Sequence, residues 1–415
     1  MNKIGKKHSG EYEFTHVATQ SKRGFWTMLV IMLGFSFFSA SMWGGGKLGT
    51  ALTTPMFLLS ILIGNLLLGC YTGTLAYIAS KTGLSTHLLA HYSFGSKGSF
   101  LPSFLLGFTQ VGWFGVGVAM FALPVQKALP DVPLWVLIWG AGLLMTGTAW
   151  FGIKALTILS AIAVPAIAIL GMVSVSRAFG DFGGFEAWWN LIPTESMSFS
   201  TAVGVCIASF ISGGSLTPDF TRFAKTPGIS VSTTVLSFFI GNSLMFFFGA
   251  VGSAFYQQSD ISDVMLKQGM ILWAIVVLGL NIWTTNDNAI YGSGLGFANI
   301  TKLPKKFFVL TNGIFGTMLS VFLYNNFVSW LNFLNVLIPS VGGVIIADFF
   351  FVHKRKYLHM DEHKFCEIRW SAIISWALGA IASFTLPGIA SLNSVLVSMV
   401  SYVLISKYVI KKDAE

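Results

Sequence analysis

The chain has 415 residues, of which only 10% are Asp, Glu, Lys or Arg, whereas about 25% are charged in an average globular protein. Hydrophobic residues make up 54% of the sequence, so too little polar material remains to cover a surface that faces water. A soluble protein is therefore excluded, and the net charge of +9 needs an explanation from membrane topology before nucleic-acid binding is considered.

The membrane spans follow from stretches without charged residues, because about 20 apolar residues cross the hydrocarbon core of a bilayer. Eight such stretches each hold one predicted helix: 24–46, 48–80, 98–126, 132–153, 155–176, 196–218, 226–259 and 268–286. Two longer stretches, 307–347 and 370–406, are each long enough for a helical hairpin, with turns predicted at Tyr324-Asn325-Asn326 and Pro387-Gly388. The sequence thus predicts an all-α integral membrane protein with twelve transmembrane helices.

The positions of the basic residues predict the orientation. If residues 1–23 and 409–415 are cytoplasmic tails, 21 of the 25 Lys and Arg residues lie on the cytoplasmic side. The four on the opposite side are Lys47, Lys127, Arg177 and Lys267. This bias satisfies the positive-inside rule, so the net charge is explained without a nucleic-acid partner and both termini are predicted in the cytoplasm.

Short strings recur in the two halves of the chain, in the same order and at a spacing of 172–177 residues. The matched strings are Ser36-Phe37-Phe38-Ser39-Ala40 with Ser209-Phe210-Ile211-Ser212-Gly213, Ile63-Gly64-Asn65 with Ile240-Gly241-Asn242, Leu106-Gly107-Phe108 with Leu278-Gly279-Leu280, and Val164-Pro165 with Ile338-Pro339. Each unit holds five helices, an odd number, so the second copy must cross the membrane in the opposite sense. We therefore predict inverted repeats at 24–177 and 196–350, followed by helices 11 and 12 at 370–408.

Inverted repeats of this kind place the substrate near the membrane midplane, where interrupted helices expose backbone groups. Helices 1 and 6 are the candidates, because small and polar residues gather in both. Helix 1 runs into Gly44-Gly45-Gly46, and helix 6 carries Ser209, Ser212 and Gly213 before it ends at Pro218. We expect both helices to be discontinuous. The alternative is that the small residues only permit close helix packing.

The densest polar cluster inside a predicted span lies in helix 8. Asn281, Thr284, Thr285 and Asn288 share one helical face and offer the neutral oxygens that bind a hard cation such as sodium. Carbonyls freed at the break in helix 1 would complete the shell, whereas the alternative role of the cluster is interhelical hydrogen bonding. Asp287 is predicted either to carry a coupling proton or to be a structural acid near the membrane end of the helix.

Gln110 and Trp113 lie on one face of helix 3 and suit a planar heterocycle. The amide offers a donor and an acceptor to a base edge, and the indole can stack on the ring. Phe210, at the predicted break of helix 6, would close the other face. His87 and His91 are expected to be polar residues at the membrane interface, because no third ligand accompanies them for a metal site.

Three strings are more specific than composition: Phe37-Phe38-Ser39-Ala40-Ser41-Met42-Trp43, Gln110-Val111-Gly112-Trp113-Phe114-Gly115-Val116-Gly117 and Asn281-Ile282-Trp283-Thr284-Thr285-Asn286-Asp287-Asn288-Ala289. They resemble the bacterial cytosine permeases of the nucleobase-cation-symport-1 family, and the likeness extends over residues 24–410. The resemblance implies the leucine-transporter fold with a 5+5 inverted repeat, and sodium-coupled uptake of cytosine across the bacterial inner membrane. No enzyme activity, organic cofactor or obligate protein partner is expected.

The resemblance also implies a substrate site in which the base lies between Trp113 and Phe210. The residues that would read its polar edge are Gln110, Ser209, Ser212, Asn281 and Asn286, with the backbone near Phe38 and Ser39. Sodium would lie between the carbonyls of Gly34, Phe37 and Asn281 and the hydroxyls of Thr284 and Thr285. The alternative is the same fold carrying another planar ring, such as uracil, a purine or a hydantoin, with protons as the coupling ion.

Overall fold

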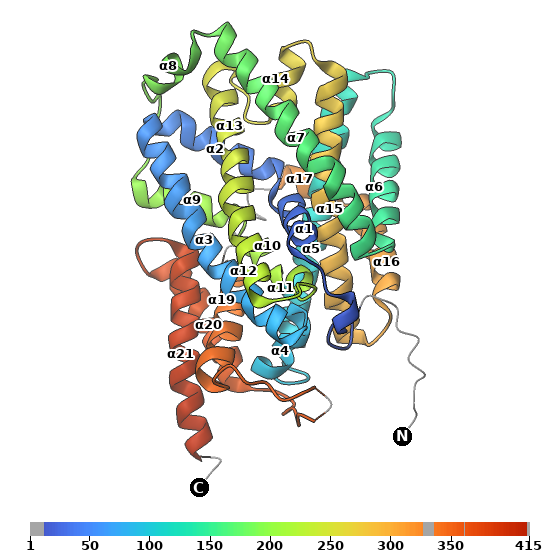
Figure 1. The fold of residues 1–415 in the computed structure, drawn as a ribbon, viewed down its shortest axis with the longest axis vertical. Helices are drawn as coiled ribbons and strands as arrows, with labels where there is room; N and C mark the ends of the chain where they lie inside the picture. Colours follow the sequence, from blue (N-terminus) through green and yellow to red (C-terminus); the bar gives the residue numbers. More distant parts are fainter. Residues whose placement is uncertain (1–11, 327–335, 361, 413–415) are drawn as a thin grey trace.

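The computed structural model describes residues 12–326, 336–360 and 362–412, and every regular element in these ranges is a helix. The helices form one bundle, in which η1 (Thr19–Ser21) and the C-terminal end of α21 (Ala390–Lys412) lie toward the same end (Figure 1). Both chain ends are expected on one side of a membrane when the number of crossings is even.

Each of the twelve predicted spans corresponds to one helix or to consecutive helices. In chain order these are α1 (Phe25–Ser36) with α2 (Ser39–Ala51), α3 (Thr54–Thr82), α5 (Phe100–Ala128), α6 (Leu134–Trp150), α7 (Ile153–Asp181), α9 (Phe199–Ala208) with α10 (Ile211–Gly214) and α11 (Thr217–Thr221), α12 (Pro227–Leu236) with η2 (Ser237–Asn242) and α13 (Ser243–Tyr256), α15 (Ile271–Thr301), α16 (Lys305–Met318) with α17 (Ser320–Asn325), α19 (Pro339–Ala347) with η3 (Asp348–Val352), α20 (Trp370–Thr385), and α21. The connecting helices are α4 (Thr86–Phe94), α8 (Gly184–Trp189) and α14 (Ile261–Lys267).

The turn predicted at Tyr324-Asn325-Asn326 is placed slightly early, because Tyr324 and Asn325 are the last residues of α17 and only Asn326 follows the helix. The stretch after Asn326 lies outside the described residues. The second turn separates α20 from α21, and Gly388 there has a φ of 104°, a backbone conformation that glycine adopts without steric cost.

The outer surface of the bundle is apolar. Five segments are long and apolar enough to cross a membrane alone, namely 54–82, 100–128, 153–181, 227–267 and 390–408, and the bent pair α1 and α2 is a sixth. On α7, the side chains of Ile158, Ile162 and Ile169 are each more than half exposed, whereas Ala163 and Ile167 are buried. An outward face of this kind is what a helix presents to lipid.

Equivalent residues of the two predicted repeats meet inside the bundle. The side-chain amide of Asn242 in η2 donates a hydrogen bond to the side-chain oxygen of Asn65 in α3 at 2.7 Å. Gly64 packs against Cys206 in α9, and its equivalent Gly241 packs against Ser36 in α1. Contacts between equivalent residues are expected where two inverted repeats meet. The exact boundaries of the repeats, 24–177 and 196–350, stay a prediction.

Helix 1 is discontinuous, as predicted, but the break lies before the glycine run. The helices α1 and α2 meet at an angle of 60°, with Phe37 and Phe38 between them in extended backbone. Gly45 lies inside α2, where an added Cβ would clash with the carbonyl oxygen of Phe246 in α13. The glycine run therefore permits close packing of α2 on α13 and does not mark the break.

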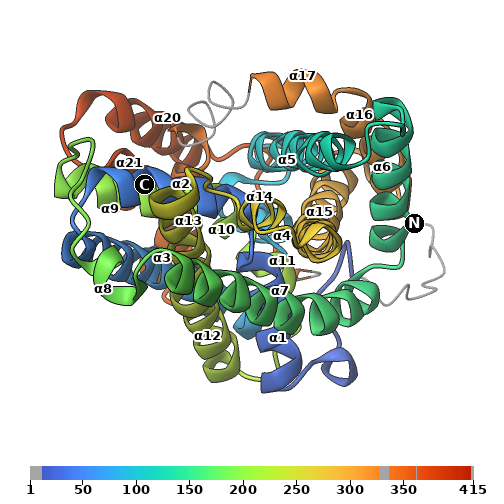
Figure 2. The ribbon, with the colours of Figure 1, turned by 90° about the horizontal axis from the view of Figure 1, so that it is seen from above.

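Helix 6 is also discontinuous. The helix α9 ends at Ala208, Ser209 and Phe210 follow outside regular helix, and α10 and α11 continue as two short pieces. Seen from above, α10 and α11 lie near the middle of the bundle, with α3, α5, α7 and α15 around them (Figure 2). The two interrupted helices thus bring backbone outside regular helix to the centre of the molecule.

Candidate functional site

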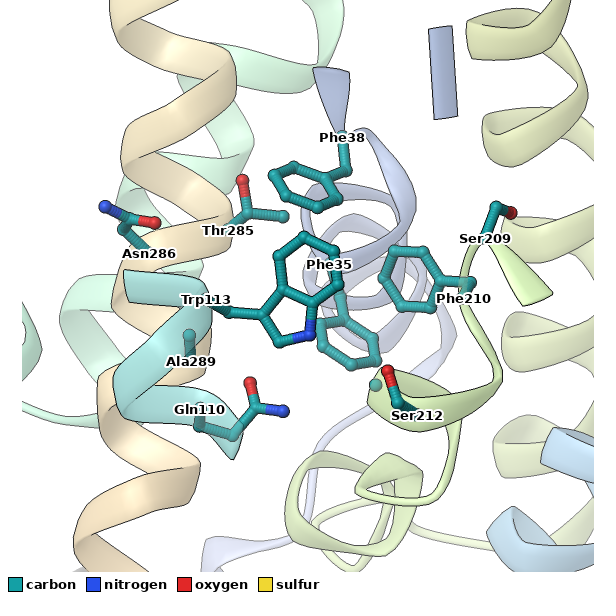
Figure 3. Close-up of a pocket in the computed structure, with 11 residues that line it drawn as sticks. Phe35, Phe38, Gln110, Trp113, Ser209, Phe210, Ser212, Thr285, Asn286 and Ala289 are labelled. Carbon is teal, nitrogen blue, oxygen red and sulfur yellow. The ribbon is translucent and has the colours of Figure 1, made fainter. Parts of the chain in front are cut away.

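A cavity lies beside the two helix breaks, which face α5 and α15 across it (Figure 3). It holds about 390 Å³ of space free of protein atoms, including the open space at its mouth. Its walls come from Phe35, Phe38, Gln110, Trp113, Ser209, Phe210, Ser212, Gly213, Thr285, Asn286 and Ala289. Of the nine residues predicted to bind substrate, the structure brings seven together around this cavity.

Four aromatic rings line the cavity. Trp113 comes from α5 and Phe210 from the break in helix 6, and both face the cavity in Figure 3. The ring of Phe38 meets Trp113 edge-on at 5.2 Å between centroids, and Phe35 meets Phe210 edge-on at 4.9 Å. Phe35 was missed in the sequence, although its position three residues before Phe38 places it in the last turn before the break. These rings hold Trp113 and Phe210 in fixed orientations.

Gln110 supplies the most informative polar group of the wall. Its side chain is only 3% exposed, and its Nε2 atom has no hydrogen-bond partner among the described residues. By contrast, the hydroxyl of Ser209 already donates to the carbonyl oxygen of Cys206 at 2.8 Å. A buried donor without an acceptor is costly, so the amide of Gln110 is poised to donate to a bound molecule.

Asn286 lines the cavity but is held by its neighbours. Its Nδ2 atom donates to the carbonyl oxygen of Phe114 in α5 at 3.1 Å and lies 3.3 Å from the sulfur of Met145 in α6. An added Cβ on Gly117 would clash with the side-chain oxygen of Asn286. The glycine in α5 therefore lets this asparagine lie flat between two helices at the cavity wall.

Two residues predicted to contact the substrate, Ser39 and Asn281, lie outside the cavity wall. They bind each other instead. The side-chain oxygen of Asn281 accepts a hydrogen bond from the backbone N–H of Ser39 and another from its hydroxyl, both at 2.9 Å. The pair ties the first turn of α2 to the middle of α15.

The oxygens predicted to bind sodium are partly brought together. The carbonyl oxygen of Asn281 accepts hydrogen bonds from the hydroxyls of Thr284 at 3.0 Å and Thr285 at 2.7 Å. On α1, Gly34 and Phe37 lie where the helix ends, so their carbonyls belong to the last four, which have no partner within a helix. The helix α1 packs on α15. The described residues contain no cluster of His, Cys, Asp or Glu for a metal, so a cation here would have neutral oxygen ligands.

Asp287 is fully buried. Its Oδ1 atom accepts a hydrogen bond from the hydroxyl of Thr148 in α6 at 2.8 Å, and that hydroxyl also accepts one from the indole N–H of Trp283. Its Oδ2 atom has no partner in the described part of the chain. Asp287 lies in the middle of α15, and its two predicted roles, a proton carrier or a structural acid, both stay predictions.

The two histidines of α4 are buried within the protein, in a helix that connects two of the predicted spans. His87 is 1% exposed and His91 is 8% exposed. The Nε2 atom of His91 lies 2.6 Å from the side-chain oxygen of Asn299 in α15. Burial lowers the pKa of His91 to about 4, and it lowers the pKa of His87 as well. Packing of α4 against the bundle hides residues that its polar sequence context places at a surface.

Comparison with known proteins shows the family to which the chain belongs. Residues 17–410 match the family described as permeases for cytosine/purines, uracil, thiamine and allantoin. The chain belongs to that family. The cytosine permease of Escherichia coli (strain K12) is 54% identical over 397 residues, which cover 95% of this chain and 94% of the relative. The resemblance to the nucleobase-cation-symport-1 permeases is thereby confirmed.

Solved structures agree on the fold of the permease. Mhp1, a nucleobase-cation-symport-1 family transporter solved in a closed conformation with bromovinylhydantoin bound, has a TM-score of 0.86 at 17% identity and covers 96% of this chain and 95% of its own. A Na⁺-coupled sialic acid symporter has a TM-score of 0.72 at 14% identity, over 97% of this chain and 93% of its own. The permease is therefore an all-helical membrane transporter with a leucine-transporter-like fold, and not an enzyme.

Proposed function

We propose that the permease imports cytosine together with sodium, by alternating access to the cavity beside the helix breaks. The observation that carries the proposal is the buried Nε2 of Gln110, which lacks an acceptor at the edge of an aromatic cavity. Cytosine is planar and uncharged and offers a carbonyl oxygen and a ring nitrogen as acceptors. It would stack between Trp113 and Phe210 while the Gln110 amide donates to its edge. The 54% identity to a cytosine permease supports the choice of base.

Sodium fits the neutral oxygens of α15 better than a proton does. The carbonyl of Asn281 and the hydroxyls of Thr284 and Thr285 would supply three ligands, and the free carbonyls of Gly34 and Phe37 would supply two more. A sodium ion there would join α1 to α15, because its ligands come from both. Of these residues, Thr285 also lines the cavity, so the ion and the base would lie close enough for each to favour binding of the other.

Alternating access would move one group of helices against another. Helices 1, 2, 6 and 7 (α1–α3 and α9–α13) would rock against helices 3, 4, 8 and 9 (α5, α6 and α15–α17). Both the proposed sodium ligands and the bonds between Ser39 and Asn281 join these two groups. Binding of sodium would therefore stabilise the arrangement that accepts the base.

Uptake of labelled cytosine into proteoliposomes tests the proposal. We expect accumulation with a sodium gradient and little without one, loss of base binding in Trp113→Ala, and weaker sodium dependence in Thr285→Val. Unlabelled uracil, purines and hydantoins would reveal the substrate range by competition. Equal uptake in sodium-free buffer would refute the coupling scheme, and intact cytosine affinity in Trp113→Ala would remove that residue from the site.

A proton-coupled transporter is the second candidate, because Asp287 is buried with one oxygen unpaired. If protons drive transport through this acid, Asp287→Asn should abolish accumulation driven by a pH gradient. If Asp287 is structural, the variant should keep sodium-driven uptake, since an amide can still accept from Thr148. Comparing both gradients in both proteins separates the two candidates.

We further propose that the permease lies in the bacterial inner membrane with both termini in the cytoplasm, as the distribution of basic residues predicts. Cys366 is exposed in the loop between η3 and α20. This loop lies toward the same end of the molecule as the C-terminal end of α21 (Figure 1). A membrane-impermeant maleimide should therefore label Cys366 in inside-out vesicles but not in intact cells, with a Cys366→Ser variant as the control. Labelling in intact cells would reverse the orientation.

A further inference from the structure

A basic cavity opens at the end of the molecule where η1 lies, away from the cavity beside the helix breaks. It holds about 930 Å³ of space free of protein atoms. Lys81 comes from the last turn of α3, and Arg355 and Lys356 come from the loop after η3. No Asp or Glu lines it within the described ranges. Three cations from two separate segments therefore meet around a space without an acidic side chain.

An apolar groove begins beside the basic cavity and runs between α3 and α12. It holds about 800 Å³ of space free of protein atoms and is bordered by Gly69, Gly73, Val231, Val235 and Phe350, among others. Arg355 lines both the groove and the basic cavity. The two spaces are therefore neighbours that share Arg355 as a lining residue.

The backbone and the neighbouring rings hold Arg355 in this position. Lys354 and Arg355 have φ angles of 47° and 65°, in the left-handed region that residues with a side chain rarely adopt. The N–H of Arg355 donates to the carbonyl oxygen of Phe349 at 2.7 Å. The guanidinium lies 5.1 Å from the ring centroid of Phe350, which stacks on Tyr77 of α3. The loop thus presents a cation to both the groove and the basic cavity.

We propose that these two neighbouring spaces bind an anionic phospholipid of the bilayer. The phosphate group would lie among Lys81, Arg355 and Lys356, and one acyl chain would lie in the groove between α3 and α12. The bilayer presents such a molecule at the depth that the site requires, with its charge at the membrane surface and its apolar chain within the hydrocarbon layer. The lipid would join the end of helix 2 to the loop after helix 10.

Native mass spectrometry of the full chain, with lipids of identical acyl chains, tests the charge requirement. The protein should retain phosphatidylglycerol in preference to phosphatidylcholine. The triple variant Lys81→Gln, Arg355→Gln, Lys356→Gln should lose this preference by at least about tenfold. The control variant Lys154→Gln, Lys225→Gln, Lys364→Gln removes three exposed cations that do not line either space and should keep the preference. Equal loss in both variants, or no preference in the unaltered protein, would overturn the proposal.

A second pair of variants tests the groove. Val231→Trp should fill it and reduce retention of phosphatidylglycerol several-fold, whereas Ile162→Trp on the outer face of α7 should not. Glycerol 3-phosphate, which has the charge but no acyl chain, should not displace the lipid at equal concentration. Displacement by it, or unchanged retention in Val231→Trp, would point to a site for soluble phosphates and overturn the lipid assignment. Thermal unfolding of each variant identifies any that fails to fold, in which case Val235→Trp replaces Val231→Trp and Lys81→Gln, Arg355→Gln replaces the triple variant.

Discussion

The side-chain oxygen of Asn281 accepts both the backbone N–H and the hydroxyl hydrogen of Ser39, each at 2.9 Å. The first N–H groups of any helix lack partners within that helix, and Phe38, which precedes α2, provides no side-chain cap. A residue of α15 therefore caps a helix from the other repeat. This relationship explains why a polar residue is required at the break, although neither Ser39 nor Asn281 lines the cavity.

Substitutions of the two partners should differ in severity. Ser39→Ala removes the hydroxyl but keeps the backbone hydrogen bond, so we expect uptake to fall only a few-fold. Asn281→Ala leaves the N–H of α2 buried without an acceptor, which costs about 1–3 kcal/mol, and uptake should fall by tenfold or more. Initial rates in proteoliposomes at matched protein content measure both. A Ser39→Ala variant that is as impaired as Asn281→Ala would place the hydroxyl itself in the binding site.

The unpaired amide of Gln110 gives the sharpest prediction about the cavity. Gln110→Leu removes the donor while keeping a side chain of similar size, so cytosine affinity should fall by about tenfold or more. Because the substitution also removes a buried hydrogen-bond donor that lacks an acceptor, the melting temperature should stay equal or rise. Equilibrium binding of labelled cytosine and thermal unfolding in detergent check the two halves. An affinity loss accompanied by a lower melting temperature would indicate a structural role instead.

Close packing of α2 on α13 should make the protein's stability sensitive to added side-chain volume at this contact. An added Cβ on Gly249 would clash with the carbonyl oxygen of Met42, so Gly249→Ala should destabilise the folded protein by about 1–3 kcal/mol. Gly140 in α6 has open space around its Cβ position, and Gly140→Ala should be neutral or slightly stabilising, since alanine favours helix. Melting temperatures of the two variants in one detergent provide the comparison. Equal values would show that the two helices can separate without cost.

Acid should destabilise the protein through His91. Its pKa is lowered by burial to about 4 in the folded state, with Lys302 and His87 also opposing its charge and Asn299 favouring it. A lowered folded pKa means that this contribution to stability is complete above the unfolded value of about 6.5 and is lost as the pH falls toward 4. The difference between the unfolded and folded pKa values corresponds to about 3 kcal/mol of unfolding free energy. His87 acts in the same direction.

The measurement for His91 is thermal unfolding between pH 7 and pH 4. His91→Gln, which can still donate to Asn299, should have a shallower loss of stability on acidification than the unaltered protein. His353 is partly exposed and follows η3, so His353→Gln serves as a histidine control outside this cluster. Parallel curves for His91→Gln and the unaltered protein would contradict the assignment.

Much of the architecture follows from local sequence. Stretches without charge delimit most of the spans because charged side chains are costly inside a bilayer, and Pro387-Gly388 ends a helix by its backbone chemistry alone. Gln110 and Trp113 were identified for a related reason. A polar amide beside an indole is conspicuous in an apolar helix, and their spacing places both on one face.

Other features of the fold and the site depend on which helix surfaces pack against each other in the tertiary structure. Gly44-Gly45-Gly46 suggested a break, yet these glycines lie inside α2, because only contact with α13 explains their small size. His87 and His91 were expected at the membrane interface, and packing of α4 buries them. The amide side chain of Asn281 is of the kind that binds a substrate, but its oxygen already accepts hydrogen bonds from Ser39. Sequence determined which segments enter the membrane, since that depends on each segment's own transfer from water to lipid. The tertiary structure alone decided which polar groups remain free for a ligand, since a hydrogen bond between residues 242 positions apart leaves no local signal.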